Sequence, residues 1–288
     1  PDVRDGVTST ADGIADALQK YYTYLFRSRP SVGSAPLLQL LRDKSLSTDV
    51  SSKIEGLITT PEVTLAINKM GKAKSPGPDL LAAEFYQTFL DLVVEPLTTV
   101  LNEAHAQHEL PTSTKQGIVK LTYKKGDPRD VRNYRPLTML NTDYKVLTSI
   151  LNRRIAKVIH YIVSSPQLGF VPGRIITEAS HLAKLLQAYL DERDEDGILV
   201  ALDWEKAFDS ISWEYLHDAV DALGFGPDIK RWYAILYNPY DPQQRTIQSN
   251  GTRTPPFSLQ SGIPQGCPLS PLTFIFVSEA LTRLIQTS

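Results

Sequence analysis

The stretch Ile198-Leu199-Val200-Ala201-Leu202-Asp203 contains five apolar residues that end directly on a carboxylate. A short uninterrupted apolar run is typical of a strand buried in a sheet, although periodicity alone does not exclude a segment of buried helix. As a strand, it would place Asp203 at its carboxyl end, where the sheet meets solvent. A carboxylate there is suited to binding a hard cation such as Mg²⁺, which prefers oxygen ligands. The alternative is that Asp203 simply ends the strand.

The bulk composition is that of a soluble globular protein. The 288 residues, 42% hydrophobic and 22% charged, suffice for one large domain or two to three subdomains. The apolar runs are too short to cross a membrane, so no membrane partner is expected. The single cysteine, Cys267, excludes a disulfide framework and predicts a reducing, intracellular setting. The start at Pro1 and the helical pattern at the other end predict a segment of a longer protein.

Charge is distributed unevenly along the chain. The formal net charge is −2, yet residues 115–157 hold eleven Lys/Arg against three Asp, whereas residues 191–228 hold twelve Asp/Glu against two Lys/Arg. A basic section beside an acidic one suits a protein that binds a polyanion with one part and a metal ion with another. The alternative is two ordinary solvated faces.

Local signals divide the chain into helices and hairpins. Helices are expected over residues 8–28, near 37–41 inside a loop at 29–53, from Thr60-Pro61 onward, and again through 85–93. A rigid Pro/Gly turn separates the last two at 72–79. Further helices are expected over 182–189, 213–223, 227–236 and from Ser270 onward, and a strand pair over 246–259 around Asn250-Gly251.

Two patterns place cations together. Strands at 117–123 and 133–138, joined by 124–127, form a hairpin on which Lys124 and Arg135 point to one side. A compact ammonium and a bidentate guanidinium are the usual holders of phosphate oxygens. The helix that follows buries Leu147, Ile150, Leu151, Ile155 and Ile159, and its outward face carries Lys145, Arg153, Arg154 and Lys157. That stripe is either a solvated face or a surface that follows a nucleic-acid backbone.

The last helix is apolar over most of its early surface and is therefore expected to be buried. Ser270 would cap it, with Pro271 at its first position. Glu279 and Arg283 would form an i,i+4 pair on its remaining wet face.

Five motifs in order resemble the reverse transcriptases of non-LTR (LINE-type) retrotransposons, and more distantly those of group II introns. They are Lys74-Ser-Pro-Gly-Pro-Asp79 with Phe85-Tyr86, Asn133-Tyr-Arg-Pro136 with Asn141 and Lys145, Gln167-x-Gly-Phe-x-Pro-Gly173, Asp203-x-x-Lys-Ala-Phe-Asp209, and Gly262-Ile-Pro-Gln-Gly-Cys-Pro-Leu-Ser-Pro271. Each motif alone is weak. The ordered set, spanning residues 60–288, is highly specific.

The resemblance implies an α+β right-hand polymerase fold. Residues 60–190 would form the fingers subdomain, including the Lys124/Arg135 hairpin. Residues 191–288 would form an incomplete palm, with the first catalytic Asp strand and the nucleotide-pocket loop interleaved with fingers helices, and the thumb would be absent. Residues 1–59 would be an N-terminal extension or a linker with one helix.

The resemblance also implies the roles of the acidic motif. Asp203 would be a catalytic aspartate that binds the two Mg²⁺ ions (or Mn²⁺), and the carbonyl of Trp204 would ligate one of them. Phe208 would be the steric gate that excludes a ribose 2′-hydroxyl and so selects deoxynucleotides. Lys206 and Asp209 match the motif but are interpreted as structural.

The remaining implied roles concern the nucleotide and the template. Lys124 and Arg135 would hold the incoming triphosphate. Gln265 and Gly266 would line the nucleotide pocket. The loop at 167–174, including Arg174, would contact the template. The implied partners are an RNA template, a DNA primer, dNTPs and the remainder of the polymerase, with an endonuclease domain in the same protein, in the nucleus and cytoplasm.

The sequence departs from the family pattern in one respect. The family requires an aromatic-Ala-Asp-Asp hairpin, and no Asp-Asp pair occurs in the 288 residues. One carboxylate does not hold two Mg²⁺ ions, so the chain alone is expected to have no appreciable polymerase activity. The competing hypothesis is a repurposed fragment that binds nucleic acid or protein without catalysis.

Overall fold

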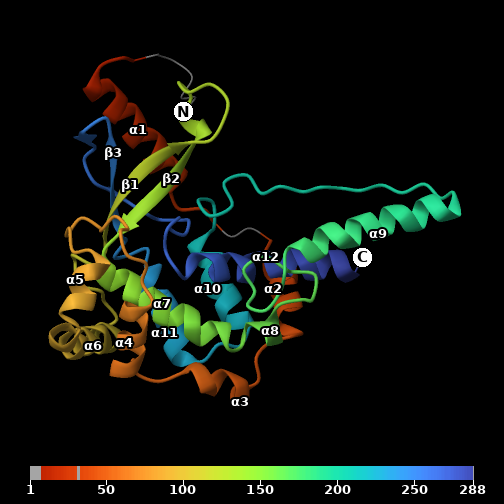
Figure 1. Ribbon diagram of the computed structural model, residues 1–288, viewed down its shortest axis with the longest axis horizontal. Coiled ribbons are helices and arrows are strands. Elements are labelled where there is room, and N and C mark those ends of the chain that lie inside the picture. Colours follow the sequence, from red (N-terminus) through yellow and green to blue (C-terminus); the bar gives the residue numbers. More distant parts are fainter. Residues whose placement is uncertain (1–7, 31–32, 288) are drawn as a thin grey trace.

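The computed structural model describes residues 8–30 and 33–287. A small sheet stands at one end of the molecule, a body of helices lies below it, and one long helix projects away from both (Figure 1). The expected mixture of helices with a sheet is confirmed.

The sheet is built from two hairpins joined by a parallel pair. Its strands are β1 (Gln116–Tyr123), β2 (Tyr134–Leu140), β3 (Gln244–Ser249), β4 (Thr252–Arg253) and β5 (Phe257–Ser258). The order is β2-β1-β3-β4, with β5 paired to β3; β1 runs antiparallel to β2 and parallel to β3. Asn250 and Gly251 both have positive φ in the two-residue turn between β3 and β4, as a type I′ turn requires.

The helices mostly form the body beneath the sheet; the first packs on the sheet itself and the ninth projects away from the body (Figure 1). In chain order they are α1 (Ala11–Leu25), α2 (Ala35–Arg42), α3 (Thr48–Ser51), α4 (Thr60–Asn68), α5 (Ala83–Thr88), α6 (Leu90–Gln107), α7 (Thr142–Ala156), α8 (Ile159–Ile162), α9 (Thr177–Arg193), α10 (Trp213–Ala222), α11 (Pro227–Leu236) and α12 (Ser270–Thr287), with 3₁₀ turns η1 (Ser52–Ile54) and η2 (Val131–Asn133). Thr59 and Glu62 form a capping box that fixes the start of α4, where Pro61 was expected at the first turn.

The helix α7 lies at the centre of the body. Every residue expected on its inner side is at most 1% exposed, and all join one continuous hydrophobic core with α1, α4, α10, α11 and α12. Most of the stabilisation of such a helix comes from this buried face rather than from helix propensity.

The N-terminal part is more structured than expected. The described residues up to 59 hold three α-helices: α1 and α2, which local signals predicted over 8–28 and near 37–41, and α3, which they did not predict. Leu18, Tyr22 and Leu25 of α1 are buried in the common core, and α2 packs against α10 and α12. The segment expected as a loop over residues 29–53 is therefore partly helical, because tertiary contacts supply the burial that stabilises these short helices.

The prediction of a buried strand over residues 198–202 is wrong. This segment has no strand partner among the described residues, and Ile198 and Leu199 are 94% and 87% exposed. The preceding α9, whose apolar residues include Leu185, has no buried residue. In Figure 1, α9 projects from the body and the segment returns alone along its upper side. An apolar run shows that a segment favours burial; it does not say which element will cover it.

Two predicted exposures are also wrong. Arg154 was expected on the outer face of α7 but is 5% exposed: it binds Glu62 at 2.7 Å and donates to the carbonyls of Gly56 and Leu57. Glu279 and Arg283 do form the expected pair, at 2.8 Å, but it is buried, and Arg283 also binds the carbonyl of Leu41. Both guanidiniums satisfy carbonyls of neighbouring segments, which a helical pattern cannot reveal.

Ser270 begins α12 but does not act as the expected cap. Its hydroxyl donates instead to the carbonyl of Pro264. Among the helices that the structure describes, none is long and apolar enough to cross a membrane.

Candidate functional site

The hairpin of β1 and β2 presents two unpaired cations on one face. Thr122 lies opposite Arg135, and the amide of Lys124 donates to the carbonyl of Asn133 at 2.9 Å, so the alternation of the strands puts Lys124 and Arg135 on the same face. Both are exposed and have no ion pair within the described chain. The neighbouring Arg129 and Arg132 are bound to Asp127 and Asp130. The hairpin therefore leaves these two cations available for an anion.

A tight turn over residues 204–209 lies beside this hairpin. Lys206 has φ 53° and its carbonyl accepts from the amides of Asp209 (2.9 Å) and Ser210 (3.0 Å). Its ammonium donates to the carbonyl of Arg132 at 3.0 Å, which ties the turn to the base of the hairpin. These contacts agree with the structural role predicted for Lys206.

The aromatic residues of this turn pack on α12. The ring of Phe208 stacks on Phe274 with centroids 5.4 Å apart and an interplanar angle of 24°, and Trp204 meets the same ring edge-on at 6.0 Å. Phe208 is half-buried. A ring held by stacking on one side keeps one orientation, which suits a gate and equally a packing residue.

The loop over residues 262–267 joins the turn to β2. The amides of Gly262 and Ile263 donate to the carbonyls of Ile211 (2.7 Å) and Phe208 (2.8 Å). On its other side the carbonyl of Gln265 accepts from the amide of Thr138 at 2.7 Å. Gly266 has φ 114°, and an added Cβ would lie 2.6 Å from the carbonyl oxygen of Thr138. Only glycine permits this approach.

Asp209 connects the turn and the loop through a side-chain bond that the sequence did not predict. Asp209 is 2% exposed, and the amide nitrogen Nε2 of Gln265 donates to its two carboxylate oxygens at 3.0 and 3.2 Å. Burial raises the pKa of the Asp209 carboxyl to about 6. The only sequence signal was the second carboxylate of the motif, which gave no indication of its partner 56 positions away.

Asp203 lies in a different environment. It is exposed and has no hydrogen bond or ion pair among the residues that the structure describes. No group of three or more His, Cys, Asp or Glu side chains suited to a metal ion occurs in residues 8–30 and 33–287. The oxygens of Asp203 and the carbonyl of Trp204 are ligands that Mg²⁺ accepts, but they supply only part of the oxygen set that such an ion takes.

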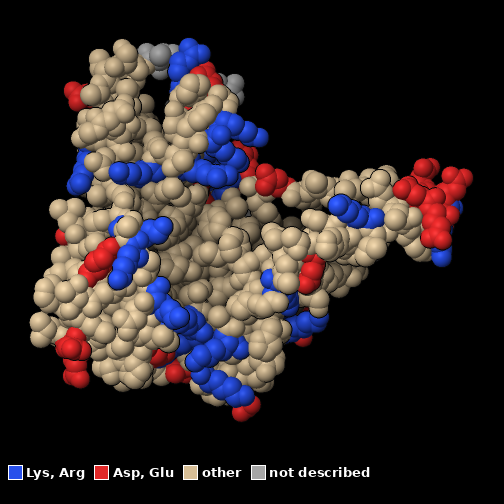
Figure 2. All heavy atoms as spheres, in the orientation of Figure 1, with Lys and Arg blue, Asp and Glu red and all other residues tan. Residues whose placement is uncertain are grey.

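A basic groove opens between α7 and the Pro/Gly turn. Its volume is about 460 Å³, and its lining includes Lys69, Lys74, Lys145, Arg153 and, at the end next to the loop, Gly266. None of the four cations has an ion pair within the described chain, and Nη1 of Arg153 is buried without a hydrogen-bond partner. Figure 2 shows a band of Lys and Arg crossing this face over α7. The groove is shaped and charged for a polyanion.

Motifs distant in sequence meet at this groove. An added Cβ at Gly77 would lie 2.1 Å from the amide oxygen of Asn141, so the turn packs directly on the start of α7. The ammonium of Lys145 reaches the carbonyl of Ser75 at 3.5 Å, and burial lowers its pKa, which the charge of Asp79 partly offsets. The loop at 167–174 is different: the guanidinium of Arg174 is bound to the carbonyls of Ser164 and Gln167, both at 2.6 Å.

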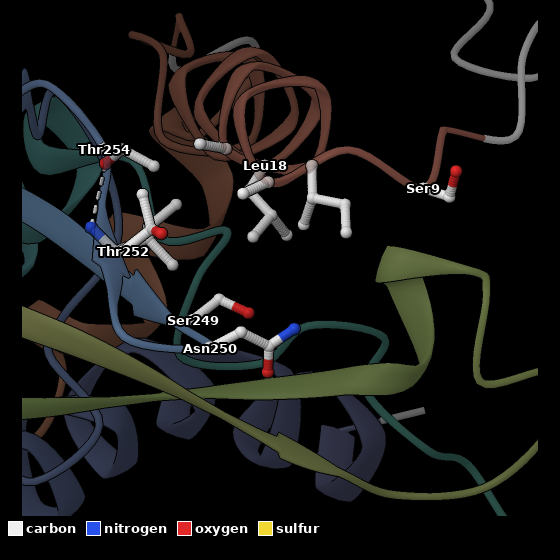
Figure 3. Close-up of a pocket in the computed structure, with 10 residues that line it drawn as sticks. Ser9, Leu18, Ser249, Asn250, Thr252 and Thr254 are labelled. Atoms are coloured by element: carbon white, nitrogen blue, oxygen red, sulfur yellow. Dashed lines mark hydrogen bonds between the residues drawn. The ribbon is translucent and has the colours of Figure 1, made fainter.

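A second cavity, of about 140 Å³, lies between α1 and the β3–β4 turn (Figure 3). Its ten lining residues are all uncharged. The hydroxyl of Thr254 is bound to the amide of Ile247 at 2.9 Å. This cavity offers neither cations nor carboxylates and is a gap in the packing of α1 on the sheet.

Comparison with known proteins identifies relatives over most of the chain. The model of the family described as "Reverse transcriptase (RNA-dependent DNA polymerase)" matches residues 123–288. A 149 kDa protein of transposon TX1 from Xenopus laevis is 31% identical over 277 residues, which cover 96% of this chain and 21% of that protein. The RNA-directed DNA polymerase from mobile element jockey of Drosophila melanogaster is 25% identical and is matched over 78% of this chain and 25% of its own length.

A third relative is the Pol polyprotein of the type-2 retrotransposable element R2DM from D. melanogaster, 24% identical over 78% of this chain. The chain spans about a fifth to a quarter of the length of these relatives. The matches confirm the resemblance to non-LTR retrotransposon reverse transcriptases that the motifs predicted.

Proposed function

This chain belongs to the reverse transcriptase (RNA-dependent DNA polymerase) family, and we propose that it is the part of an RNA-directed DNA polymerase that binds the incoming deoxynucleotide and guides the template. The observation that carries the proposal is the convergence of three distant segments: the unpaired cations Lys124 and Arg135, the turn bearing Phe208, and the loop bearing Gln265.

The residues of these three segments would each contact a different part of the nucleotide. Lys124 and Arg135 bind the triphosphate through charge-assisted hydrogen bonds. Phe208, fixed by its stack on Phe274, fills the space that a ribose 2′-hydroxyl would take. Gln265 and Gly266 line the pocket from the other side. In this proposal the β1–β2 hairpin belongs to fingers (60–190), and the Phe208 turn and Gln265 loop to part of a palm (191–288) of a right-hand polymerase.

The basic groove provides the path for nucleic acid. Four cations that form no ion pair within the described chain line it, and its end at Gly266 adjoins the proposed nucleotide pocket. A chain of phosphates gains affinity by displacing counterions from such a groove, and the binding weakens as salt rises. An RNA template with its DNA primer is the polyanion that the family uses.

The proposed chemistry is nucleotidyl transfer, for which two Mg²⁺ ions would supply electrostatic stabilisation of the developing negative charge. Asp203 and the carbonyl of Trp204 would hold part of that metal set. Completing the metal set takes carboxylates from another segment, so the 288 residues alone do not extend a primer. In this proposal the remainder of the polymerase also covers the apolar run 198–202.

Primer extension on an RNA template with Mg²⁺ tests the proposal. It compares this chain with the longest continuous reading frame that contains it. Extension by the longer protein alone, with RNA binding by both, is the expected result.

No extension by either protein, with salt-sensitive RNA binding retained, would favour the second candidate, a non-catalytic nucleic-acid-binding fragment. The basic groove is the observation behind that candidate, because the groove does not involve Asp203.

A further inference from the structure

We propose that Asp209 is a positioning residue: its buried carboxylate holds the side-chain amide of Gln265 so that the amide oxygen faces the incoming nucleotide as a hydrogen-bond acceptor. This inference rests on the proposed function for its catalytic consequence, but its geometric part concerns only the two side chains.

The first argument is that nothing else in the loop needs the carboxylate. The backbone over residues 262–267 already has its own hydrogen bonds: the amides of Gly262 and Ile263 donate to neighbouring carbonyls, and the carbonyl of Gln265 accepts from the amide of Thr138. The carbonyl of Pro264 accepts from the hydroxyl of Ser270. The group that remains free to rotate is the side chain of Gln265. Within the described residues, it is also the only side chain that the structure shows donating to Asp209.

The second argument concerns cost. A carboxylate that is 2% exposed loses its hydration, and here a neutral amide is its direct donor, while Lys206 and Arg29 act on it only through their charge. An asparagine would occupy the same volume without a buried charge. What the ionised carboxylate adds is a fixed orientation of the Gln265 side-chain amide.

The third argument concerns how the carboxylate orients the amide of Gln265. An ionised carboxylate only accepts hydrogen bonds, so it selects the orientation of Gln265 with the NH₂ group turned inward. The amide oxygen then points the opposite way. Gln265 is half-buried, and this oxygen has no hydrogen-bond partner among the described residues. An acceptor held at the wall of the pocket suits a donor group of the nucleotide, such as a sugar hydroxyl.

Protonation would remove the selection. Below about pH 6 the Asp209 carboxyl gains a proton and becomes a donor as well, so the amide of Gln265 can turn over. The other titratable groups that face Asp209 are Tyr21 and Tyr22 of α1, Lys206 of its own turn and Arg29. Burial raises the pKa of both tyrosines, so they stay protonated between pH 5 and 8.

The geometric part can be measured on the 288-residue chain by NMR with ¹⁵N-labelled glutamine. We expect the side-chain NH₂ resonances of Gln265 to shift with an apparent pKa near 6 and to lose that shift in Asp209→Asn. Gln243 is the internal control, because its amide is bound to Tyr144 and Leu236 with no carboxylate beside it. Resonances of Gln265 that do not respond to pH, or that respond equally in Asp209→Asn, would overturn the proposal.

The catalytic part of the proposal is tested by a double-mutant cycle in the protein encoded by the longest reading frame that extends a primer. We expect Asp209→Asn to raise the KM for dNTP about five- to tenfold with a smaller change in kcat, and to have little further effect in the Gln265→Ala background. Asp228→Asn, on α11, is the control for loss of a carboxylate elsewhere in the body: it is partly buried and accepts a hydrogen bond from the amide of Gly56.

Equal effects of Asp209→Asn in both backgrounds would show a general structural role and overturn the inference. Absence of extension by the wild-type protein would count against the proposed function instead, and the NMR titration would still decide the contact between Asp209 and Gln265.

Discussion

Two carboxylates six residues apart in one motif lie in opposite environments. Asp209 is buried, bonded to Gln265 and surrounded by a turn, a loop and a strand that are mutually hydrogen-bonded. Asp203 is exposed at the end of an apolar segment that pairs with no strand among the residues that the structure describes. The contrast teaches that the hydrogen bonds of this chain fix the geometry of the proposed nucleotide pocket, whereas the proposed metal ligand lies on a segment that pairs with no strand of the described residues.

The largest effect is expected at the exposed carboxylate, Asp203. Replacing Asp203 by Asn removes a charged metal ligand, so we expect extension by the longer polymerase to fall by roughly three orders of magnitude or more. Primer–template affinity should stay within about twofold, because the basic groove lies elsewhere.

Steady-state extension and filter binding measure the two quantities. Asp196→Asn, an exposed carboxylate on the same segment, is the matched control. Loss of binding as large as the loss of activity would make Asp203 a structural residue.

In the hydrogen-bonded region around Asp209, Phe208→Ala should admit ribonucleotides. Removing the ring opens space for the 2′-hydroxyl, and pockets discriminate such groups by roughly 10- to 100-fold, so we expect the preference for dNTP over rNTP to fall by about that factor. Competing extension with dNTP and rNTP measures it. Phe274→Leu, which weakens the stack beneath Phe208, should give a smaller loss; unchanged discrimination in both variants would assign Phe208 to packing alone.

The buried carboxylate of Asp209 also predicts a dependence of stability on pH. Burial raises its pKa from 3.8 to about 6, which corresponds to a cost of about 2 to 3 kcal/mol for the charged form. Because the folded pKa is the higher one, the stability is fully present below about pH 4 and is lost as the pH rises through 6.

Asp209→Asn should therefore unfold at a higher temperature than the wild type at pH 8 and at a similar temperature at pH 4. Thermal unfolding of the 288-residue chain at both pH values measures this. A variant that is less stable at pH 8 would mean that the ionised carboxylate stabilises the loop, contrary to the cost argument above.

A smaller effect is expected at the hairpin. Lys124→Ala removes one cation from the proposed triphosphate site, and a hydrogen bond to a charged group contributes about 1.5 kcal/mol, so the KM for dNTP should rise about tenfold with little change in RNA affinity. Lys125→Ala is the matched control, because that residue is equally exposed but lies next along the chain, outside the face shared with Arg135. A larger loss of RNA binding than of nucleotide affinity would move Lys124 to the template path.

The smallest effect is expected in the groove. Arg153→Ala removes one phosphate contact, so RNA affinity should fall only a few-fold and the salt dependence of log K should become shallower by about 0.7. Titrations at several salt concentrations measure the slope. Lys53→Ala, which removes a cation already bound to Asp49, should leave the slope unchanged; equal slopes for both variants would exclude the groove as the nucleic-acid site.

Local signals in the sequence predicted much of this architecture correctly. The start of α4 at Thr60-Pro61, the Asn250-Gly251 turn and the inner face of α7 all depend on neighbours within a few positions, so the pattern contains the information that decides them. The same holds for the alternation that puts Lys124 and Arg135 on one face. Motif order, likewise a property of the sequence, identified the family.

The errors share a different cause. Arg154 was assigned to solvent and Glu279–Arg283 to a wet face because helical spacing shows which residues share a face, but not what lies against it. The segment 198–202 was assigned to the core because apolar composition measures the gain from burial, which is realised only where another element supplies the partner surface.

The sequence by itself therefore determined the family, through the order of its motifs, and most of the local elements, since these follow from residue type and short-range spacing. Only the tertiary structure decided that Asp209 is the buried carboxylate and Asp203 the exposed one. The physical reason is that burial and hydrogen bonding are set by segments far apart in the chain, here the loop with Gln265, 56 positions away.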